Sequence, residues 1–293
     1  MKSIYTLVPD IQDYINRNDD WYENTAKDTY FRSGLPSDRN NSRRSSLRLS
    51  GLGDKCPRQL WYSIHHPELA ETLPPNAKFK YGYGHVLENM ALSLARLAGH
   101  SVEGEQDELA VDGVVGHRDA VVDGCVVDVK SCSSLQFSKF KERTLAQRDD
   151  FGYLFQLDGY ILGSANDPLV HVKDKGYFLA IDKTLGHMVL YEHKLRKDTI
   201  RERIRLYKEI VAKATGPACT CRTKLIGSSG NIGLDTVASY SAFKYCCFPN
   251  LRTFLYSTGP VYLTKVVRTP DVPEVGRDGQ RRASSSEASN RVF

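Results

Sequence analysis

Two aspartates, Asp119 and Asp128, lie on either side of Asp123-Gly124 in a valine-rich stretch of the chain. Asp-Gly favours a type I′ turn, and the resulting hairpin register places Asp119 directly opposite Asp128. Side chains alternate between the two faces of a strand, so Lys130 shares the face of Asp128, and His117 lies across from Lys130. The pattern predicts two carboxylates, a lysine and a histidine on one surface.

The facing carboxylates predict a site for a hard divalent metal ion. Two carboxylates whose Cβ atoms are about 5 Å apart repel each other unless a cation or a proton lies between them. Oxygen ligands suit Mg²⁺, which keeps several waters for a substrate or nucleophile. Lys130 would add a positive charge that orients a water or neutralises charge developing on a phosphate. The alternative is a solvated hairpin face with a routine ion pair, but three valines adjoin Asp128 and indicate a largely buried strand.

Two helices could bring further polar side chains to this site. On a helix expected over residues 76–97, His85 and Glu88 are three apart and share a face, where they could supply a third ligand and a further carboxylate. The alternative for such a histidine is a structural role. Gln156 and Tyr160, four apart on a later helix, offer an amide and a phenol that could hold a phosphate, a base or the lysine.

The apolar pattern predicts the elements that would hold these residues. Helices are expected over 76–97, 151–162 and 197–214, a short amphipathic helix within 1–31, an antiparallel meander over 108–130, and strands over 169–173, 177–181 and 187–192. This order predicts an α/β or α+β fold in which helices flank one central mixed sheet.

Length and composition limit the class of protein. The chain has 293 residues, 41% of them hydrophobic, which is enough for one large domain or two small ones. No apolar stretch approaches the roughly 20 residues of a membrane helix, and the first residues lack the apolar core of a secretory signal. We therefore expect an intracellular protein with no membrane partner. The net charge of +5 is too small by itself to indicate nucleic acid.

Residues 32–50 form a basic segment with five arginines against one aspartate, a local charge of +4. They predict either a solvated linker or an arm that contacts phosphates. The candidate DNA-binding residues are Arg43, Arg44 and Arg48, with Tyr83 as a base-stacking side chain. The expected boundaries are an N-terminal helical segment and basic arm over 1–50, a globular domain over 51–266 with its core at 76–195 and a cysteine-bearing subdomain at 215–250, and a disordered tail over 267–293.

Five short motifs occur in a characteristic order. They are Cys56-Pro57-Arg58-Gln59-Leu60-Trp61-Tyr62, Gly82-x-x-His85-x-x-Glu88, Gly116-His117-Arg118-Asp119, Asp128-Val129-Lys130 and Gln156-x-x-x-Tyr160. As a set, they resemble the RecB-like branch of the PD-(D/E)XK nucleases, in particular the CRISPR-associated adaptation exonucleases and related bacteriophage exonucleases. The resemblance covers about residues 50–165 and implies the restriction-endonuclease-like core of that family.

The resemblance also implies roles for individual residues. The ligands of one or two Mg²⁺ or Mn²⁺ ions would be His85, Asp119, Asp128, the backbone carbonyl of Val129, and additionally Glu88. The catalytic residues would be Asp119, Asp128, Lys130, Gln156 and Tyr160. Asp128 stands where the family more often has Glu, but its two oxygens can serve the same metal.

The activity implied is metal-dependent hydrolysis of DNA by an exonuclease, an enzyme of DNA recombination, replication or processing. Its partners would be a strand end or single-stranded DNA and a recombination or replication protein, in a bacterial or phage-infected host cytoplasm. Two alternatives stay open. One is a DNA-end-binding or recombination-accessory module with weak or absent catalysis, and the other is an endonuclease of the same fold, because the site residues do not encode whether a free end is required.

The chain has seven cysteines, an odd number that favours thiols or metal ligands over a disulfide framework. Relatives of this type hold a 4Fe-4S cluster with one cysteine before the nuclease core and three after it, spaced C-x2-C-x5-C. Cys56 fits the leading position and Cys247 the last, but Ala238 and Ser241 occupy the two positions between them. These substitutions favour loss of the cluster. The alternative is a rearranged set drawn from Cys56, Cys247, Cys221 and Cys219.

Overall fold

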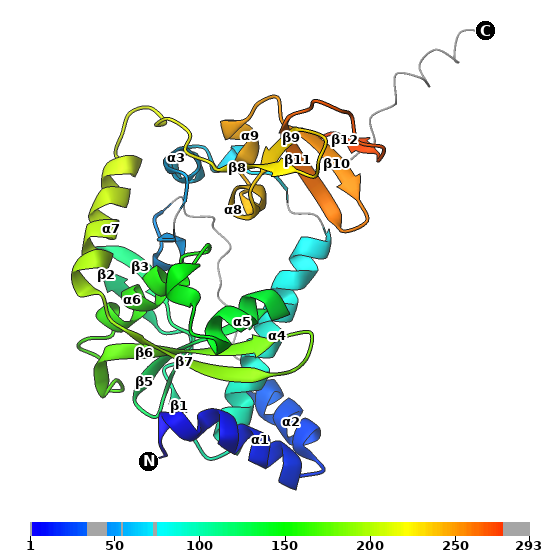
Figure 1. Ribbon diagram of the computed structural model, residues 1–293. Helices are drawn as coiled ribbons and strands as arrows, with labels where there is room; N and C mark the ends of the chain where they lie inside the picture. Colours follow the sequence, from blue (N-terminus) through cyan, green and yellow to red (C-terminus); the bar gives the residue numbers. More distant parts are fainter. Residues whose placement is uncertain (1, 34–45, 54, 73–74, 278–293) are drawn as a thin grey trace. The chain divides into compact units, whose positions relative to one another are not determined.

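The computed structural model describes residues 2–33, 46–53, 55–72 and 75–277 (Figure 1). The chain divides into two compact units, one comprising residues 1–54 and 74–208 and the other residues 55–73 and 209–293. The single globular domain expected over 51–266 is therefore two units. The second unit combines a short segment from the first quarter of the chain with the C-terminal region.

The first unit holds most of the helices and the larger sheet. Its helices are α1 (Leu7–Arg17), α2 (Trp21–Ser33), α4 (Pro75–Leu97), α5 (Ser134–Lys141), α6 (Tyr153–Gly163) and most of α7 (Lys197–Val211). Its strands are β1 (Val102–Glu103), β2 (Glu108–Val111), β3 (Val114–His117), β4 (Ala120–Val122), β5 (Cys125–Cys132), β6 (Val172–Asp182) and β7 (Met188–Lys194). The two strands expected over 169–173 and 177–181 are one continuous strand, β6.

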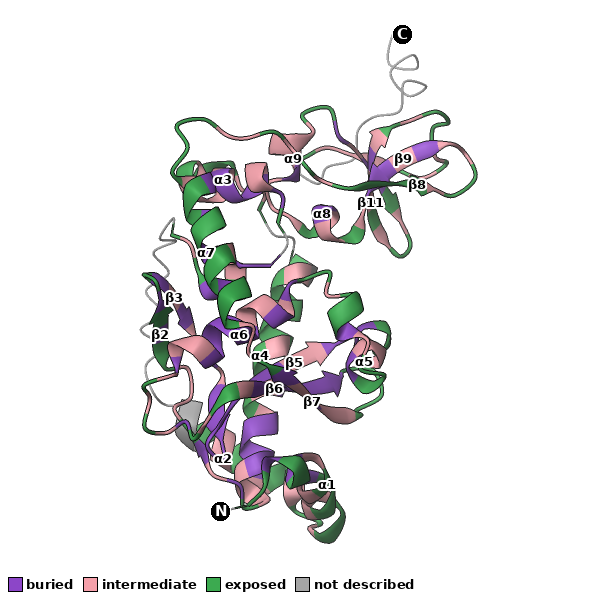
Figure 2. Ribbon diagram, turned by 60° about the vertical axis from the view of Figure 1, so that its left-hand side comes forward, coloured by how far each residue is buried: buried purple, intermediate pink, exposed green. Residues whose placement is uncertain are grey.

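A five-stranded mixed sheet forms the centre of this unit, in the order β1-β4-β5-β6-β7. Strands β5 and β6 are parallel and the other neighbours are antiparallel. Helices α1 and α4 pack on one face through an apolar cluster that includes Leu7, Leu92, Val127 and Val129, while Phe140 of α5 packs against Phe178 on the other. Figure 2 shows the buried residues concentrated along these strands. The predicted central mixed sheet flanked by helices is confirmed.

Both Asp-Gly pairs form the expected turns. Asp112 and Asp123 have positive φ angles of 47° and 49°, and the glycine after each has 78° and 76°, as type I′ turns require. The register of β4 and β5 pairs Ala120 with Val127, as predicted from the second turn. The two hairpins nevertheless belong to different sheets, because β2 and β3 form a separate two-stranded sheet.

Arg118 causes the break between these hairpins. It is 1% exposed, and its guanidinium lies 2.8 Å from the Asp107 carboxylate, 2.6 Å from Asp167 and 3.0 Å from the Ser164 hydroxyl. Burial of a charged side chain requires such partners, and the chain bends at residues 118–119 to reach them. His117 in β3 consequently pairs with Glu108 in β2, so the predicted position of His117 across from Lys130 is wrong.

The second unit is built around a smaller sheet. Its elements are α3 (Pro57–His65), β8 (Thr223–Ile226), β9 (Asn231–Leu234), α8 (Thr236–Tyr240), α9 (Lys244–Cys247), β10 (Arg252–Tyr256), β11 (Gly259–Lys265) and β12 (Glu274–Val275). The sheet order is β12-β10-β11-β9-β8. Strand β12 lies in the segment expected to be disordered, so that expectation is corrected for residues 274–275; residues 278–293 of the expected tail lie outside the described part of the chain. Among the described residues, no helix has the length and apolar character needed to cross a membrane.

Two glycines provide a matched test of packing near the predicted site. A Cβ at Gly116 would lie 2.8 Å from the Leu49 Cβ and 3.0 Å from the Tyr160 ring, whereas one at Gly82 on α4 would meet nothing within 4 Å. We expect Gly116→Ala to lower the free energy of unfolding by about 1–3 kcal/mol through overpacking. Gly82→Ala should raise it by up to about 1 kcal/mol through helix propensity. Urea unfolding measures both, and equal effects of the two substitutions would contradict the described packing.

Candidate active site

Asp128 lies in the middle of the central sheet and is fully buried. Its Oδ2 atom lies 2.5 Å from the Lys130 Nζ atom, and its Oδ1 atom accepts a hydrogen bond of 3.1 Å from the Gln156 side chain. Both partners lie on the sheet face that α6 covers, because residues 128 and 130 alternate with the valines that face α4. The predicted pairing of Asp128 with Lys130 on one face is confirmed by this geometry.

Asp119 immediately precedes β4 and continues the register that brings it next to Asp128. Its Oδ2 atom accepts a 2.7 Å hydrogen bond from the backbone N–H of Val129. Burial raises the pKa of Asp119 well above its usual range, and the negative charges of Asp128 and Glu88 raise it further. The N–H and C=O of one strand residue point to the same edge, so the Val129 carbonyl is directed toward the Asp119 side of β5.

Lys130 is held as a cation. Burial alone would lower the pKa of Lys130, but the charges of Asp128 and Asp119 outweigh it and raise the pKa above its ordinary value. Its Nζ atom also lies 5.3 Å from the centre of the Tyr153 ring. Burial raises the pKa of Asp128, an effect that the neighbouring lysine opposes. A protonated lysine can donate hydrogen bonds and stabilise negative charge, but it cannot accept a proton.

Helix α6 supplies a support for Asp128. The Gln156 amide donates to the Asp128 carboxylate and, over 2.9 Å, to the Tyr160 hydroxyl, so the amide is held at two points. Tyr160 is buried, and burial raises its pKa, which keeps the phenol neutral. The two residues share a face of this helix as predicted. Gln156 contacts the β5 acid Asp128, and Tyr160 contacts Gln156.

Helix α4 brings Glu88 close to the aspartates. Glu88 accepts a 2.6 Å hydrogen bond from Gln106, and its charge contributes to the raised pKa of Asp119. His85 is exposed, and its Nδ1 atom lies 3.6 Å from the Glu88 carboxylate. The structure thus brings His85 to Glu88. Within the part of the chain that the structure describes, His85, Asp119 and Asp128 do not form a group with ligand atoms within 4.8 Å of one another.

The sequence patterns did not identify three residues that contact or position the residues of this site. Arg118 anchors the bend that delivers Asp119, Tyr153 lies against Lys130, and Gln106 holds Glu88. Arg118 lies within the Gly116-His117-Arg118-Asp119 motif, next to a predicted metal ligand, which was a usable signal. Gln106 carried no such signal, because its loop position depends on the tertiary fold.

Arg48 and Tyr83 are the predicted DNA-binding residues that lie within the described part of the chain. Arg48 is exposed and forms an isolated β-bridge with Val115, and Tyr83 is 40% exposed on α4. Arg43 and Arg44 lie outside the described residues. The C-terminal end of the basic segment lies near the bend at residues 118–119, because Leu49 is fully buried and lies close to Gly116 and Gly159.

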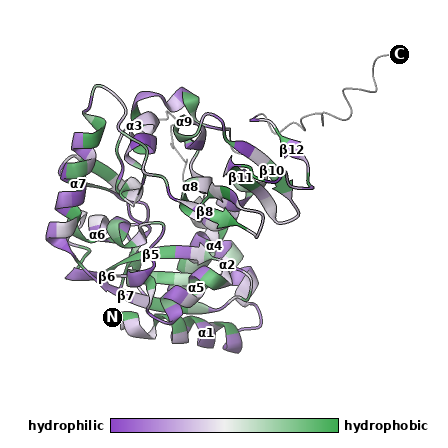
Figure 3. Ribbon diagram, turned by 45° about the horizontal axis from the view of Figure 1, so that its top comes forward, coloured by the Kyte–Doolittle hydropathy of each residue, from purple (hydrophilic) through white to green (hydrophobic). Residues whose placement is uncertain are grey.

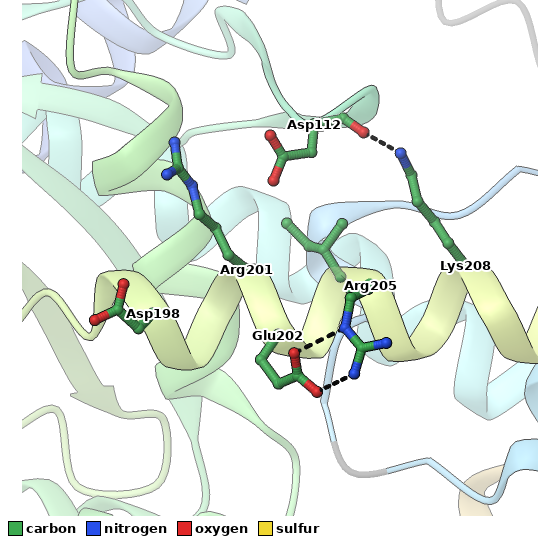
Figure 4. A pocket seen from close by; sticks show the side chains of 7 residues that line it. Asp112, Asp198, Arg201, Glu202, Arg205 and Lys208 are labelled. Atoms are coloured by element: carbon green, nitrogen blue, oxygen red, sulfur yellow. Dashed lines mark hydrogen bonds and ion pairs between the residues drawn. The ribbon is translucent and has the colours of Figure 1, made fainter.

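A surface pocket of about 450 Å³ lies along α7 and involves none of these residues (Figure 4). Its lining residues are Asp112, Asp198, Arg201, Glu202, Ile204, Arg205 and Lys208. The acidic and basic groups balance, and pairs such as Glu202 with Arg205 neutralise each other. Hydrophilic and hydrophobic bands alternate along this helix (Figure 3), and its apolar side is buried at Ile200 and Ile204. The balanced charge does not favour binding of a polyanion here.

The structure also brings four cysteines together in the second unit. Cys56, Cys219, Cys221 and Cys247 offer sulfur atoms that all lie within 4.8 Å of one another. These are the members of the rearranged set considered as an alternative to cluster loss. Ala238, at one of the expected ligand positions, is buried in a small apolar cluster with Leu234 and Leu251.

No protein-family model matches the chain, and no curated protein matches it. Similar solved structures include an alkaline exonuclease (LHK-Exo) from Laribacter hongkongensis, with 15% identity over 59% of this chain and 89% of that one and a TM-score of 0.41. The same enzyme in complex with dAMP has 14% identity, 58% and 88% coverage, and a TM-score of 0.38. The structure of SSO0001 has 16% identity, 79% and 97% coverage, and a TM-score of 0.39.

Replacing Asp119 tests whether the paired acids are strained without a cation. Because the pKa of Asp119 is raised by folding, the folded protein retains a proton that the unfolded chain releases, and stability falls as the pH rises above about 4. Asp119→Asn abolishes this pH-dependent loss of folding stability and keeps a side-chain oxygen that can accept the hydrogen bond from the Val129 N–H. In EDTA near pH 7 we expect the variant to be more stable than the wild type by about 1 kcal/mol.

Thermal unfolding in EDTA across pH 5 to 8, and again with Mg²⁺, measures this effect. The wild type should gain stability from Mg²⁺ by mass action, and the variant should gain much less. A variant that is less stable than the wild type at every pH in EDTA would contradict the proposed strain.

Proposed function

We propose that this protein is a metal-dependent deoxyribonuclease that acts as an exonuclease on DNA. The observation that carries the proposal is the pairing of Asp119, which immediately precedes β4, with the fully buried Asp128 of β5, which Lys130 contacts. Two like charges held next to each other destabilise a fold. Such a pair is therefore typical of a site whose function requires it. A surface ion pair would not need the support that Gln156 gives to Asp128.

The residues present fit Mg²⁺ or Mn²⁺. The donors at the aspartates are carboxylate oxygens, the hard ligands that these ions prefer. The Asp128 carboxylate is fully buried, and its Oδ2 atom forms an ion pair of 2.5 Å with Lys130. The ligands would be Asp119, Asp128 and the Val129 carbonyl, joined by Glu88 and His85 from α4. When bound, the cation would polarise the phosphate and lower the pKa of a coordinated water.

The remaining chemistry belongs to the side chains of the chain itself. Lys130, protonated and held between Asp128 and the Tyr153 ring, would donate to the nucleophilic water or to a phosphate oxygen and stabilise the added negative charge. It would not act as the general base. Gln156 and Tyr160 would keep the Asp128 carboxylate in one orientation while the substrate binds.

The exonuclease mode is supported by the resemblance of the five motifs to RecB-like exonucleases. Binding of the DNA backbone would involve the basic segment that ends at Arg48, so affinity should fall as salt concentration rises. The role of the enzyme would lie in DNA recombination, replication or processing. An endonuclease of the same fold and a non-catalytic DNA-end-binding module remain the alternatives that experiments must separate.

Substitution of the two central residues tests the catalytic proposal. Asp128→Asn and Lys130→Met should each reduce Mg²⁺-dependent release of nucleotides from end-labelled DNA by about 100-fold or more. Asp112→Asn is the matched control, because Asp112 lies in the other type I′ turn, where Asn is also tolerated. Its activity should equal that of the wild type. Wild-type activity in folded Asp128→Asn protein would refute the assignment of this residue.

The form of the DNA distinguishes the alternatives. We expect digestion of linear DNA with Mg²⁺ or Mn²⁺, none with EDTA, and no cutting of covalently closed single-stranded circles, because the proposed enzyme requires an end. Cutting of circles would identify an endonuclease. Tight binding to labelled ends without metal-dependent hydrolysis would identify a binding module, and both outcomes are read from the same set of reactions.

A further inference from the structure

Four cysteine side chains from three distant segments converge in the second unit. Cys56 immediately precedes α3, Cys219 and Cys221 lie before β8, and Cys247 ends α9. The sulfur of Cys56 lies 3.9 Å from that of Cys219 and 3.8 Å from that of Cys247. All four sulfurs lie within 4.8 Å of one another, and none of the four residues forms a disulfide.

These distances discriminate between the centres that four thiolates can hold. A single tetrahedral zinc with bonds of about 2.3 Å requires sulfur atoms about 3.8 Å apart. In a four-iron cluster each thiolate binds a different iron, so the ligand sulfurs are held roughly 6 Å apart. A disulfide requires about 2.05 Å. The separations of 3.8 and 3.9 Å match the single ion, and the 4.8 Å limit excludes the spacing of the cluster.

We propose that Cys56, Cys219, Cys221 and Cys247 bind one structural zinc ion in tetrahedral geometry. The proposed ion differs from the 4Fe-4S cluster that the sequence resemblance implied, because the sulfur separations are shorter than those of the cluster. Ala238 and Ser241 stand at two ligand positions of the C-x2-C-x5-C pattern, and Cys219 and Cys221 supply sulfur from a different segment. A site with four protein ligands is closed, as structural zinc sites are.

Hydrogen bonds and charge around the sulfurs agree with thiolate ligands. The backbone N–H of Thr220 donates to the Cys56 sulfur over 3.3 Å, and the N–H of Cys221 donates to the Cys219 sulfur over 3.4 Å. Such donors offset the negative charge of metal-bound thiolates. Zinc with four thiolates carries a net charge of −2, and the positive Arg58 side chain is electrostatically coupled to the sulfurs of Cys247 and Cys219.

The second unit also has a physical need for such a link. Its buried apolar side chains are fewer than those of the first unit. They include a small cluster of Leu234, Ala238 and Leu251, against which Cys221 packs, and the separate residues Leu60, Trp61, Phe254 and Leu263. Folds with a modest core commonly gain stability from metals or disulfides. Three of the ligands lie at 219–247, whereas Cys56 comes from the separate 55–73 segment. The ion would therefore join the two parts of the unit, beside the ion pair of Lys244 with Glu71.

The metal content of the full-length protein tests this directly. Protein purified without chelator from cells supplied with both zinc and iron should contain about one zinc per chain, little iron and no acid-labile sulfide. The Asp128→Asn variant should retain this zinc, which separates it from metal at the proposed nuclease site. Iron and sulfide with broad absorbance at about 400 nm would overturn the proposal. Folded protein that contains no metal, or four cysteines oxidised to two disulfides, would overturn it as well.

Neighbouring cysteines provide a matched pair of variants. Cys247→Ser should lose most of the bound zinc, whereas Cys246→Ser, one residue away and outside the group of four, should keep about one zinc per chain. Wild-type protein reconstituted with cobalt should show the intense visible bands of tetrahedral cobalt thiolate, a test that does not depend on how a variant folds. Retention of zinc by soluble Cys247→Ser protein, or octahedral cobalt bands in the wild type, would contradict the four-sulfur site. Failure of the nuclease assay leaves these measurements unaffected.

Discussion

The repulsion between two neighbouring carboxylates, one of them fully buried, is the constraint on which the first unit depends. Asp128 lies within the central sheet and Asp119 immediately precedes β4, and desolvation and the charge of Asp128 both raise the pKa of Asp119. The surrounding groups hold the two carboxylates in place although their repulsion destabilises the fold. Lys130 and Gln156 contact Asp128, and the Val129 N–H binds Asp119. Removing one acid relieves the strain, whereas removing a supporting group leaves the acids less compensated, so the two kinds of change should act in opposite directions on stability.

The placement of these acids follows from a break in the sheet. If the strand before Asp119 had continued, the β2–β3 hairpin would lie in the central sheet and cover the edge of β5. The buried Arg118, bound by Asp107, Ser164 and Asp167, turns the chain away at this point. Among the described residues, no strand pairs with β5 beyond Val127 on the side of β4, and the N–H of Val129 donates instead to Asp119. The ion pairs of Arg118 thereby help to place the Asp119 carboxylate beside β5.

Local sequence rules predicted the parts of this arrangement that depend on neighbours along the chain. The Asp123-Gly124 turn determines the β4–β5 register, and with it the meeting of Asp119 and Asp128. Helical spacing likewise predicted α4 and α6, the helices that carry Glu88 and Gln156. The position of His117 was wrong because it depends on Arg118, whose partners are 11 to 49 residues away along the sequence. The C-terminal sheet was missed because its strands are short and mostly half-exposed, with little apolar periodicity.

The two units differ in what holds them together, and this difference bears on the cysteines. In the first unit a large continuous apolar cluster joins α1 and α4 to the sheet. In the second, the corresponding cluster of Leu234, Ala238 and Leu251 is much smaller, and Cys221, one of the convergent sulfur donors, packs against it. The C-x2-C-x5-C spacing did not reveal the group of four sulfurs, because ligand sets are defined by distance in the folded chain and not by intervals in the sequence. Sulfur atoms from distant segments can therefore form one metal-binding group. Since a single zinc ion needs shorter sulfur separations than a cluster, the spacing of the four sulfurs bears on which metal they would select.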